Sequence, residues 1–191
     1  MTNEIRIDCW QPNPAHLTEE LDMLSEVLRA CVHGGGAVSF ILPFSHDDAK
    51  AFWQNKVLPG VQTGACCVLV ARDGQRIVGT VQLDLATPPN QPHRAEVRKL
   101  LVHPDARRRG IARALMLAAE QQAREARRSL LTLDTVTGGF AEPLYLSLGY
   151  TIVGVIPKYS LRPDSSDLDS TTVMFKDLGG WTNHGSRLGK S

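Results

Sequence analysis

The sequence predicts an α/β (α+β) fold, in which a mixed, mostly antiparallel central sheet of six to seven strands is flanked by about four helices. The chain has 191 residues, 42% of them hydrophobic, which is enough for one domain with a sizeable core. Short apolar stretches typical of strands are interleaved with stretches whose apolar residues recur at helical spacing. In chain order they predict a strand, two helices, three strands, a helix, a strand, a helix and two strands.

The N-terminal part is predicted to contain a strand over residues 4–9, a helix over residues 17–32 and a helix over residues 45–58. The strand is indicated by alternating apolar and charged side chains, and each helix by apolar side chains on one face. We expect the first helix to end at the three glycines of residues 34–36, which suit a helix C-terminus. The second helix is expected to begin at Ser45 and to end at Pro59 and Gly60.

The remaining predicted elements are strands over residues 65–71, 76–85 and 95–102, a helix from 110 to about 128, a strand over 130–136, a helix over 140–148, and strands over 151–156 and 171–175. Asp73 and Gly74 are typical of a hairpin turn between the first two of these strands. Pro143 is compatible with a helix only in its first turn. We found no repeats or heptads, so we expect a single domain over residues 1–178 and a flexible tail over residues 179–191.

Composition argues against several classes of protein. The net charge of +1 gives no support for a nucleic-acid-coating protein, and no apolar run is long enough to cross a bilayer. The N-terminus has early acidic residues and no long apolar core, so we expect a cytoplasmic protein. The cysteines and histidines show no metal-binding spacing, and we expect reduced structural thiols and no metal. The cysteines are Cys9, Cys31, Cys66 and Cys67.

A basic turn between the strand over residues 95–102 and the following helix predicts an anion site. The first turn of a helix has free backbone amides and the positive end of the helix dipole. Gly110 would leave those amides accessible, and Arg107, Arg108 and Arg109 add positive charge. We expect a diphosphate or another compact polyanion here. A solvated arginine face and a nucleic-acid contact are the alternatives.

Two segments resemble the GNAT superfamily of N-acetyltransferases. Arg107-x-x-Gly110-x-Ala112 is similar to its Q/R-x-x-G-x-G/A pattern, and residues 145–150 resemble its Y-x-x-L-G-F/Y stretch. The predicted order of elements also resembles that family. The resemblance implies an acetyl-CoA-dependent enzyme that acetylates the amine of a small molecule.

The same resemblance implies a set of cofactor-binding residues. The loop would wrap the pyrophosphate of acetyl-CoA, through Arg107, Arg108, Arg109, Gly110, Ile111 and Ala112. The backbone of Leu100, Leu101 and Val102 would hydrogen-bond the pantetheine arm and polarise the acetyl carbonyl. Gly139 stands where many family members have an asparagine that binds CoA, and Ala112 replaces a commoner glycine.

Further segments resemble the tabtoxin-resistance acetyltransferases, which act on a small amine toxin related to amino acids. These segments are residues 32–40, 94–100, 133–135 and 141–145. The resemblance implies cleft roles for Glu96, Asp134 and Tyr145. It extends the expected acceptors to toxins, antibiotics and amino-acid-like compounds.

The candidate catalytic residues each have a structural alternative. Tyr145 could protonate the leaving thiolate, or simply pack on the sheet. Glu96 or Asp134 could take a proton from the amine or bind it as a counter-charge, and the sequence leaves open which. The alternatives are a surface ion pair for Glu96 and a strand-end hydrogen-bond acceptor for Asp134.

A histidine next to the glycines is a candidate for substrate binding. We expect His33, Gly34 and Gly35 to line the substrate cleft, with helix capping as the alternative for His33. His103 is expected to be solvated. A catalytically silent CoA-binding sensor is the alternative function, and a homodimer is an arrangement that the sequence leaves open.

Overall fold

The computed structural model describes residues 4–180, and it confirms the predicted fold class. Most of the predicted tail therefore lies outside the described residues. Seven strands form one sheet in the order β1-β2-β3-β4-β5-β7-β6, and every neighbouring pair is antiparallel except β4–β5. The strands are β1 (Ile5–Cys9), β2 (Cys66–Asp73), β3 (Arg76–Asp84), β4 (Arg94–Val102), β5 (Leu130–Val136), β6 (Thr151–Leu161) and β7 (Leu168–Asp177).

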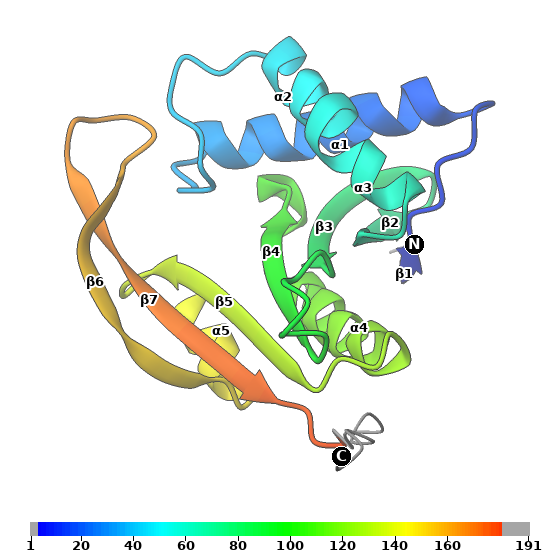
Figure 1. The fold of residues 1–191 in the computed structure, drawn as a ribbon. Helices are drawn as coiled ribbons and strands as arrows, with labels where there is room; N and C mark the ends of the chain where they lie inside the picture. Colours follow the sequence, from blue (N-terminus) through cyan, green and yellow to red (C-terminus); the bar gives the residue numbers. More distant parts are fainter. Residues whose placement is uncertain (1–3, 181–191) are drawn as a thin grey trace.

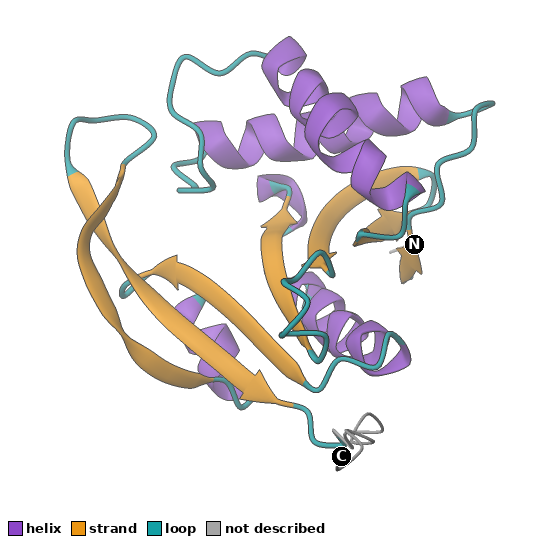
Figure 2. Ribbon diagram, in the orientation of Figure 1, coloured by secondary structure: helices purple, strands orange, loops and turns teal. Residues whose placement is uncertain are grey.

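Helices cover both faces of the sheet (Figure 2). On one face, here called the α4 face, lie α4 (Ile111–Glu125) and α5 (Glu142–Ser147). On the other, the α1 face, lie α1 (Leu17–His33), α2 (His46–Phe52) and α3 (Leu58–Gln62). Each face has its own hydrophobic core beneath its helices, whereas β6 carries apolar side chains that stay exposed, among them Val153, Val155 and Tyr159. Within residues 4–180, no helix is long and apolar enough to span a bilayer.

The parallel pair β4–β5 is joined over only three residues. Pairing runs from Arg94 opposite Leu130 to Glu96 opposite Thr132, and beyond these residues the two strands separate. Figure 1 shows β4 and β5 running apart from this point. The backbone of the second half of β4 therefore has no strand partner on its β5 side. We call this region the β4–β5 divergence.

A β-bulge in β4 changes which face its side chains point to. Gln82 of β3 pairs with Arg98, but Thr80 pairs with Leu101, so two residues of β4 stand opposite one of β3. Lys99 is the bulged residue that has a positive φ of 49°. Before the bulge the odd-numbered Val97 belongs to the core of the α4 face, whereas after it Leu101 packs in the core of the α1 face. The bulge thus turns β4 side chains over at the β4–β5 divergence.

Several predicted boundaries are wrong. The helix expected to stop at Pro59 continues through a π-helical turn over Trp53–Val57 into α3, where Pro59 lies in the first turn and needs no amide partner. Strands β6 and β7 extend well beyond the predicted residues. Pro157 is tolerated within β6 because β6 is an edge strand of the sheet.

Gly79 allows α4 to approach the sheet closely. A Cβ at Gly79 would lie 2.9 Å from the Leu101 carbonyl oxygen and 3.2 Å from side-chain atoms of Ile111 and Leu115. We expect Gly79→Ala to destabilise the protein by roughly 1–3 kcal/mol, because backbone or helix must move. Urea unfolding would measure the loss. Gly154→Ala is the control, since a Cβ there has no neighbour within 4 Å, and equal losses in the two variants would contradict this account.

Candidate active site

The polar residues predicted for catalysis lie on the α1 face beside the β4–β5 divergence. Leu131 and Leu133 of β5 are in the core of the α4 face, so Asp134 points to the other face. Glu96 is placed in the same way, between Ala95 and Val97 of β4. The structure therefore brings the two candidate carboxylates to the same face, one from each diverging strand.

Glu96 is held in an ion-pair network. Its two carboxylate oxygens accept hydrogen bonds from Nε and Nη2 of Arg98, at 2.9 and 3.0 Å. Arg98 also contacts Asp84 at 2.6 Å, and Arg94 lies 3.8 Å from Glu96. The hydrogen bonds that Arg98 donates to Glu96 are the main reason why the pKa of Arg98 is raised. This arrangement matches the surface ion pair that the sequence left open for Glu96.

Asp134 is far less engaged. Its side chain is on an exposed residue, and its carboxylate accepts a hydrogen bond from the Thr171 hydroxyl at 2.9 Å. Among the described residues no Lys, Arg or His nitrogen lies within ion-pair distance of it. Of the two candidates, Asp134 is thus the carboxylate with lone pairs available to an incoming amine.

Tyr145 approaches from the opposite side of the sheet. It lies on α5, is only 6% exposed, and packs in the core of the α4 face. Burial, and then the negative charge of Asp134, raise the pKa of Tyr145 to about 12. The phenol therefore keeps its proton at neutral pH, and Asp134 is close enough to act on it electrostatically. Within residues 4–180 no hydrogen bond occupies its hydroxyl.

The basic turn has the geometry expected of an anion site. A single 3-10 turn (Pro104–Ala106) connects β4 to Arg107–Gly110, and Gly110 caps α4 in the left-handed conformation with a φ of 76°. In the part of the chain that the structure describes, the amides from Arg108 to Arg113 donate no hydrogen bond. Six adjacent donors are therefore free at the positive end of α4.

The three arginines of this turn are used differently. Arg109 pairs with Asp73 at 2.7 Å, and Arg107 donates to the Val102 carbonyl oxygen at 3.3 Å. Arg108 is exposed, has a positive φ of 64°, and has no acidic partner among the described residues. Arg108 is thus the arginine with its charge least compensated by the protein.

His103 is buried, so the expectation that it is solvated is wrong. It is 7% exposed, and its Nδ1 accepts a hydrogen bond from the Asp105 amide at 3.3 Å. Its Nε2 lies 3.9 Å from Glu26. The side chain caps the 3-10 turn, a role that depends on a turn that the sequence pattern did not predict.

The glycine loop after α1 lies next to the basic turn. Arg107 would be 3.8 Å from a Cβ at Gly34, whose amide caps α1, and Gly35 has a φ of 79°. His33 contacts the Phe44 carbonyl oxygen at 2.8 Å through Nε2. His33 thus fixes the segment over residues 37–44. Gly139 lies in the turn between β5 and α5 and donates to the Val136 carbonyl oxygen at 3.0 Å.

The segment over residues 37–44 contacts both β4 and the turn between β6 and β7. Residues 32–40 were singled out by resemblance, but sequence reasoning missed this bridging role. At one end Ser39 accepts a hydrogen bond from Lys99 Nζ at 3.1 Å, and at the other the Leu42 amide donates to the Pro163 carbonyl oxygen at 2.8 Å. Lys99 belongs to β4 and Pro163 to the turn between β6 and β7. Figure 1 shows this segment between α1 and α2, reaching toward that turn. A local sequence pattern cannot predict these two hydrogen bonds, since they join three distant parts of the chain.

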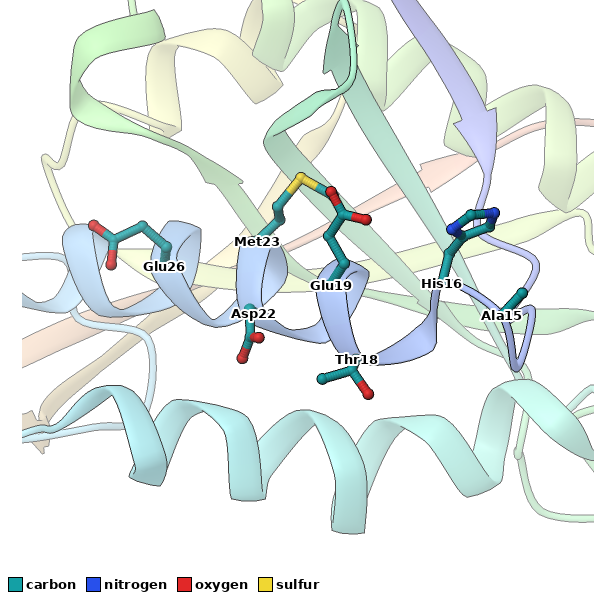
Figure 3. Close-up of a pocket in the computed structure, with 7 residues that line it drawn as sticks. All are labelled: Ala15, His16, Thr18, Glu19, Asp22, Met23 and Glu26. Carbon is teal, nitrogen blue, oxygen red and sulfur yellow. The ribbon is translucent and has the colours of Figure 1, made fainter.

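A separate hollow lies along α1 and has a different character (Figure 3). It is lined by Ala15, His16, Thr18, Glu19, Asp22, Met23 and Glu26. None of these is a predicted site residue, and three carboxylates make the hollow a poor place for a diphosphate. Residues 4–180 also contain no group of three His, Cys, Asp or Glu side chains that could hold a metal ion.

Comparison with known proteins supports one family. The model of the acetyltransferase (GNAT) family matches residues 36–150. The fold is similar to that of YncA from Salmonella typhimurium, solved with its cofactor acetyl-CoA, with 18% identity, 93% of this chain and 95% of that chain covered, and a TM-score of 0.72.

Two further structures are similar over nearly their whole length. An N-acetyltransferase from Staphylococcus aureus Mu50 shares 17% identity, with 93% of this chain and 100% of that chain covered and a TM-score of 0.75. A ribosomal-protein-alanine N-acetyltransferase from Brucella melitensis shares 21% identity, with 91% and 99% covered and a TM-score of 0.71.

Proposed function

Since the chain belongs to the acetyltransferase (GNAT) family, we propose that it transfers the acetyl group of acetyl-CoA to the amine of a small molecule. The acceptor would be a toxin, an antibiotic or an amino-acid-like compound. The observation that carries this proposal is the row of free amides at the basic turn, located at the end of the strand whose backbone is unpaired toward β5. Strand β4 and the basic turn that follows it thus supply an anion site next to a strand edge that has no strand partner.

The residues of this region fit the two ends of acetyl-CoA. The free amides of residues 108–113 and the charge of Arg108 suit its diphosphate. The edge formed by Leu100, Leu101 and Val102 has no strand partner on its β5 side, although Arg107 donates to the Val102 carbonyl oxygen. It suits the amides of a pantetheine arm, which would hydrogen-bond as an added strand does. Pairing to β4 would direct the acyl end toward the bulge at Lys99.

The proposed reaction is direct attack of the amine on the thioester. A carbon–nitrogen bond forms, the carbon–sulfur bond breaks, and the electron pair leaves with the sulfur. Asp134 takes a proton from the amine, directly or through water, and Tyr145 gives its proton to the leaving thiolate. Backbone amides of β4 beyond Glu96 would stabilise the negative charge that develops on the carbonyl oxygen.

We propose Asp134, rather than Glu96, as the base. Asp134→Asn should lower kcat/KM for the amine by roughly 10- to 100-fold, because the amide still accepts from Thr171 but cannot take a proton. Glu96→Gln should cost less, since Arg98 already holds that carboxylate. Steady-state kinetics of both variants would test the assignment, and a larger loss in Glu96→Gln would reverse it.

The proposed function is tested by following thiol release from acetyl-CoA in the presence of individual amines. The panel would contain amino acids, amine toxins, aminoglycosides, polyamines and short peptides with a free N-terminus, and mass spectrometry would identify the acetylated product. We expect thiol release only with accepted amines. Calorimetric binding of CoA without turnover on any amine would favour the catalytically silent sensor instead.

A further inference from the structure

We propose that Lys99 determines which acceptors are used, by binding a carboxylate that the acceptor carries close to its amine. This inference rests on the proposed function and names the acceptor class for the same site. It is carried by the position of Lys99 at the β-bulge, by its lack of an acidic partner, and by the uncompensated carboxylate of Asp134 on the neighbouring strand.

Lys99 differs from the other two cations of β4. Arg98 makes ion pairs with Glu96 and Asp84, and Arg94 is hydrogen-bonded to Gln91 and Thr132 and lies 3.8 Å from Glu96. Lys99 has no carboxylate within ion-pair distance anywhere in residues 4–180. Its charge is therefore the one on this strand that remains to be neutralised.

Within residues 4–180, the surroundings of Lys99 give its charge weak cation–π attraction but no counter-ion. Its Nζ lies 5.7 Å from the ring centre of Phe40 and 5.9 Å from that of Phe52, and its hydrogen-bond acceptor is the neutral Ser39 hydroxyl. Burial, and then the positive charge of Arg98, lower the pKa of Lys99. A partly buried cation without a counter-ion gains more from an anionic ligand than a solvated lysine would.

Lys99 and Asp134, neither of which has an ion-pair partner within residues 4–180, belong to opposite sides of the β4–β5 divergence. Lys99 is on β4 and Asp134 on β5, and the charge of Asp134 acts on Lys99. An acceptor with a carboxylate near its ammonium group would match both, whereas a polyamine or another purely cationic acceptor would be repelled by Lys99. The amine would then face the base assigned above.

The competing explanation is that Lys99 only fastens residues 37–44 to β4. The hydrogen bond to Ser39 and the contacts with the two rings would serve that purpose without any ligand. The two roles differ in one measurable way. Fastening affects every acceptor alike, whereas charge recognition affects acceptors that carry the carboxylate.

The test uses accepted amino acids and their primary amides, which have nearly the same size but differ in the negative charge. Because the amine of the amide is also less basic, each acceptor is compared between wild type and variant. Wild-type protein should prefer the acid, and Lys99→Met, which keeps an unbranched stem without the charge, should lower kcat/KM for the acid by roughly 10- to 100-fold. The amide should change by less than about threefold. Lys99→Arg should restore part of the preference, and thermal unfolding would confirm that each variant is folded.

Lys158→Met is the matched control, because Lys158 is also a strand lysine with a positive φ, 54°, but lies on the edge strand β6. It should leave the preference for the acid unchanged. Equal losses for acid and amide in Lys99→Met, or no loss for the acid, would overturn the inference and leave the acetyltransferase proposal intact.

Binding without turnover separates the two proposals. We would titrate an N-acetylated amino acid, the product analogue, into wild-type and Lys99→Met protein by calorimetry with CoA present. Binding that weakens about tenfold or more in the variant supports the Lys99 assignment even if no amine is turned over. Binding that is unchanged overturns it.

Discussion

Replacing Ala112 by glutamate should weaken the binding of acetyl-CoA by about 2–4 kcal/mol, or roughly 30- to 1,000-fold, without unfolding the protein. Ala112 is the second residue of α4, next to the free amides of the basic turn. A carboxylate there would stand close to the diphosphate and repel it. Calorimetry with CoA would measure the loss.

The same substitution should act on stability in the opposite direction. A negative charge in the first turn of a helix interacts favourably with the helix dipole, by about 0.3–1 kcal/mol. Because α4 has no acidic residue in its first turn, Ala112→Glu should leave the free energy of unfolding unchanged or raise it slightly. A variant that is at least as stable but binds CoA poorly cannot be explained by damage to the fold.

Ala112→Gln is the matched control for this experiment. Glutamine has nearly the size of glutamate but no charge, so it separates a steric block from repulsion. We expect it to retain most of the affinity for CoA. If both variants lose affinity equally, the loss is steric, and if neither does, the diphosphate does not bind at the start of α4.

The fold was predictable because its signals are local. Alternating and helical patterns fix seven strands and the main helices, and the structure confirms the sheet that they form. The basic turn could be predicted for the same reason, since Arg107 to Ala112 are consecutive residues and Gly110 adopts the conformation that the pattern requires. The ligand expected there stays a prediction.

The candidate site was less predictable because it depends on contacts between distant residues. The sequence shows that Glu96 and Asp134 are carboxylates in strands, but not that Arg98 holds one of them while the other is left exposed. Nor does alternation along β4 predict a bulge, which depends on its register with β3. Lys99 was therefore missed as a site residue, although it lies within the predicted strand over residues 95–102.

Replacing Tyr145 by phenylalanine should lower kcat by roughly 100-fold or more while leaving the affinity for acetyl-CoA unchanged. The ring is buried in the core and would be retained, so the variant removes one hydroxyl and little packing. Kinetics and calorimetry with CoA would be compared. A collapse of CoA binding would instead assign Tyr145 a structural role.

Its neighbour Tyr150 provides the control for this prediction. The ring centres lie 5.8 Å apart, and the Tyr150 hydroxyl is buried without a hydrogen-bond partner among the described residues. Tyr150→Phe should therefore be neutral or stabilising and should leave turnover nearly unchanged, because an unsatisfied buried hydroxyl is removed. Equal losses of turnover in the two variants would show that turnover depends on the polarity or packing of this core. They would contradict the assignment of Tyr145 as the acid.

The pH dependence adds a test of sign to the Tyr145 prediction. Burial raises the pKa of Tyr145 to about 12, so its phenol stays protonated, and able to donate, throughout the range from about pH 6 to about pH 10. Tyr145→Phe should therefore lower kcat by the same factor at every pH. The acidic and alkaline limbs of the pH–rate profile should keep their apparent pKa values. If Tyr145→Phe abolished an alkaline limb within that range, the phenol would be ionising there, and it could not be the buried acid that we propose.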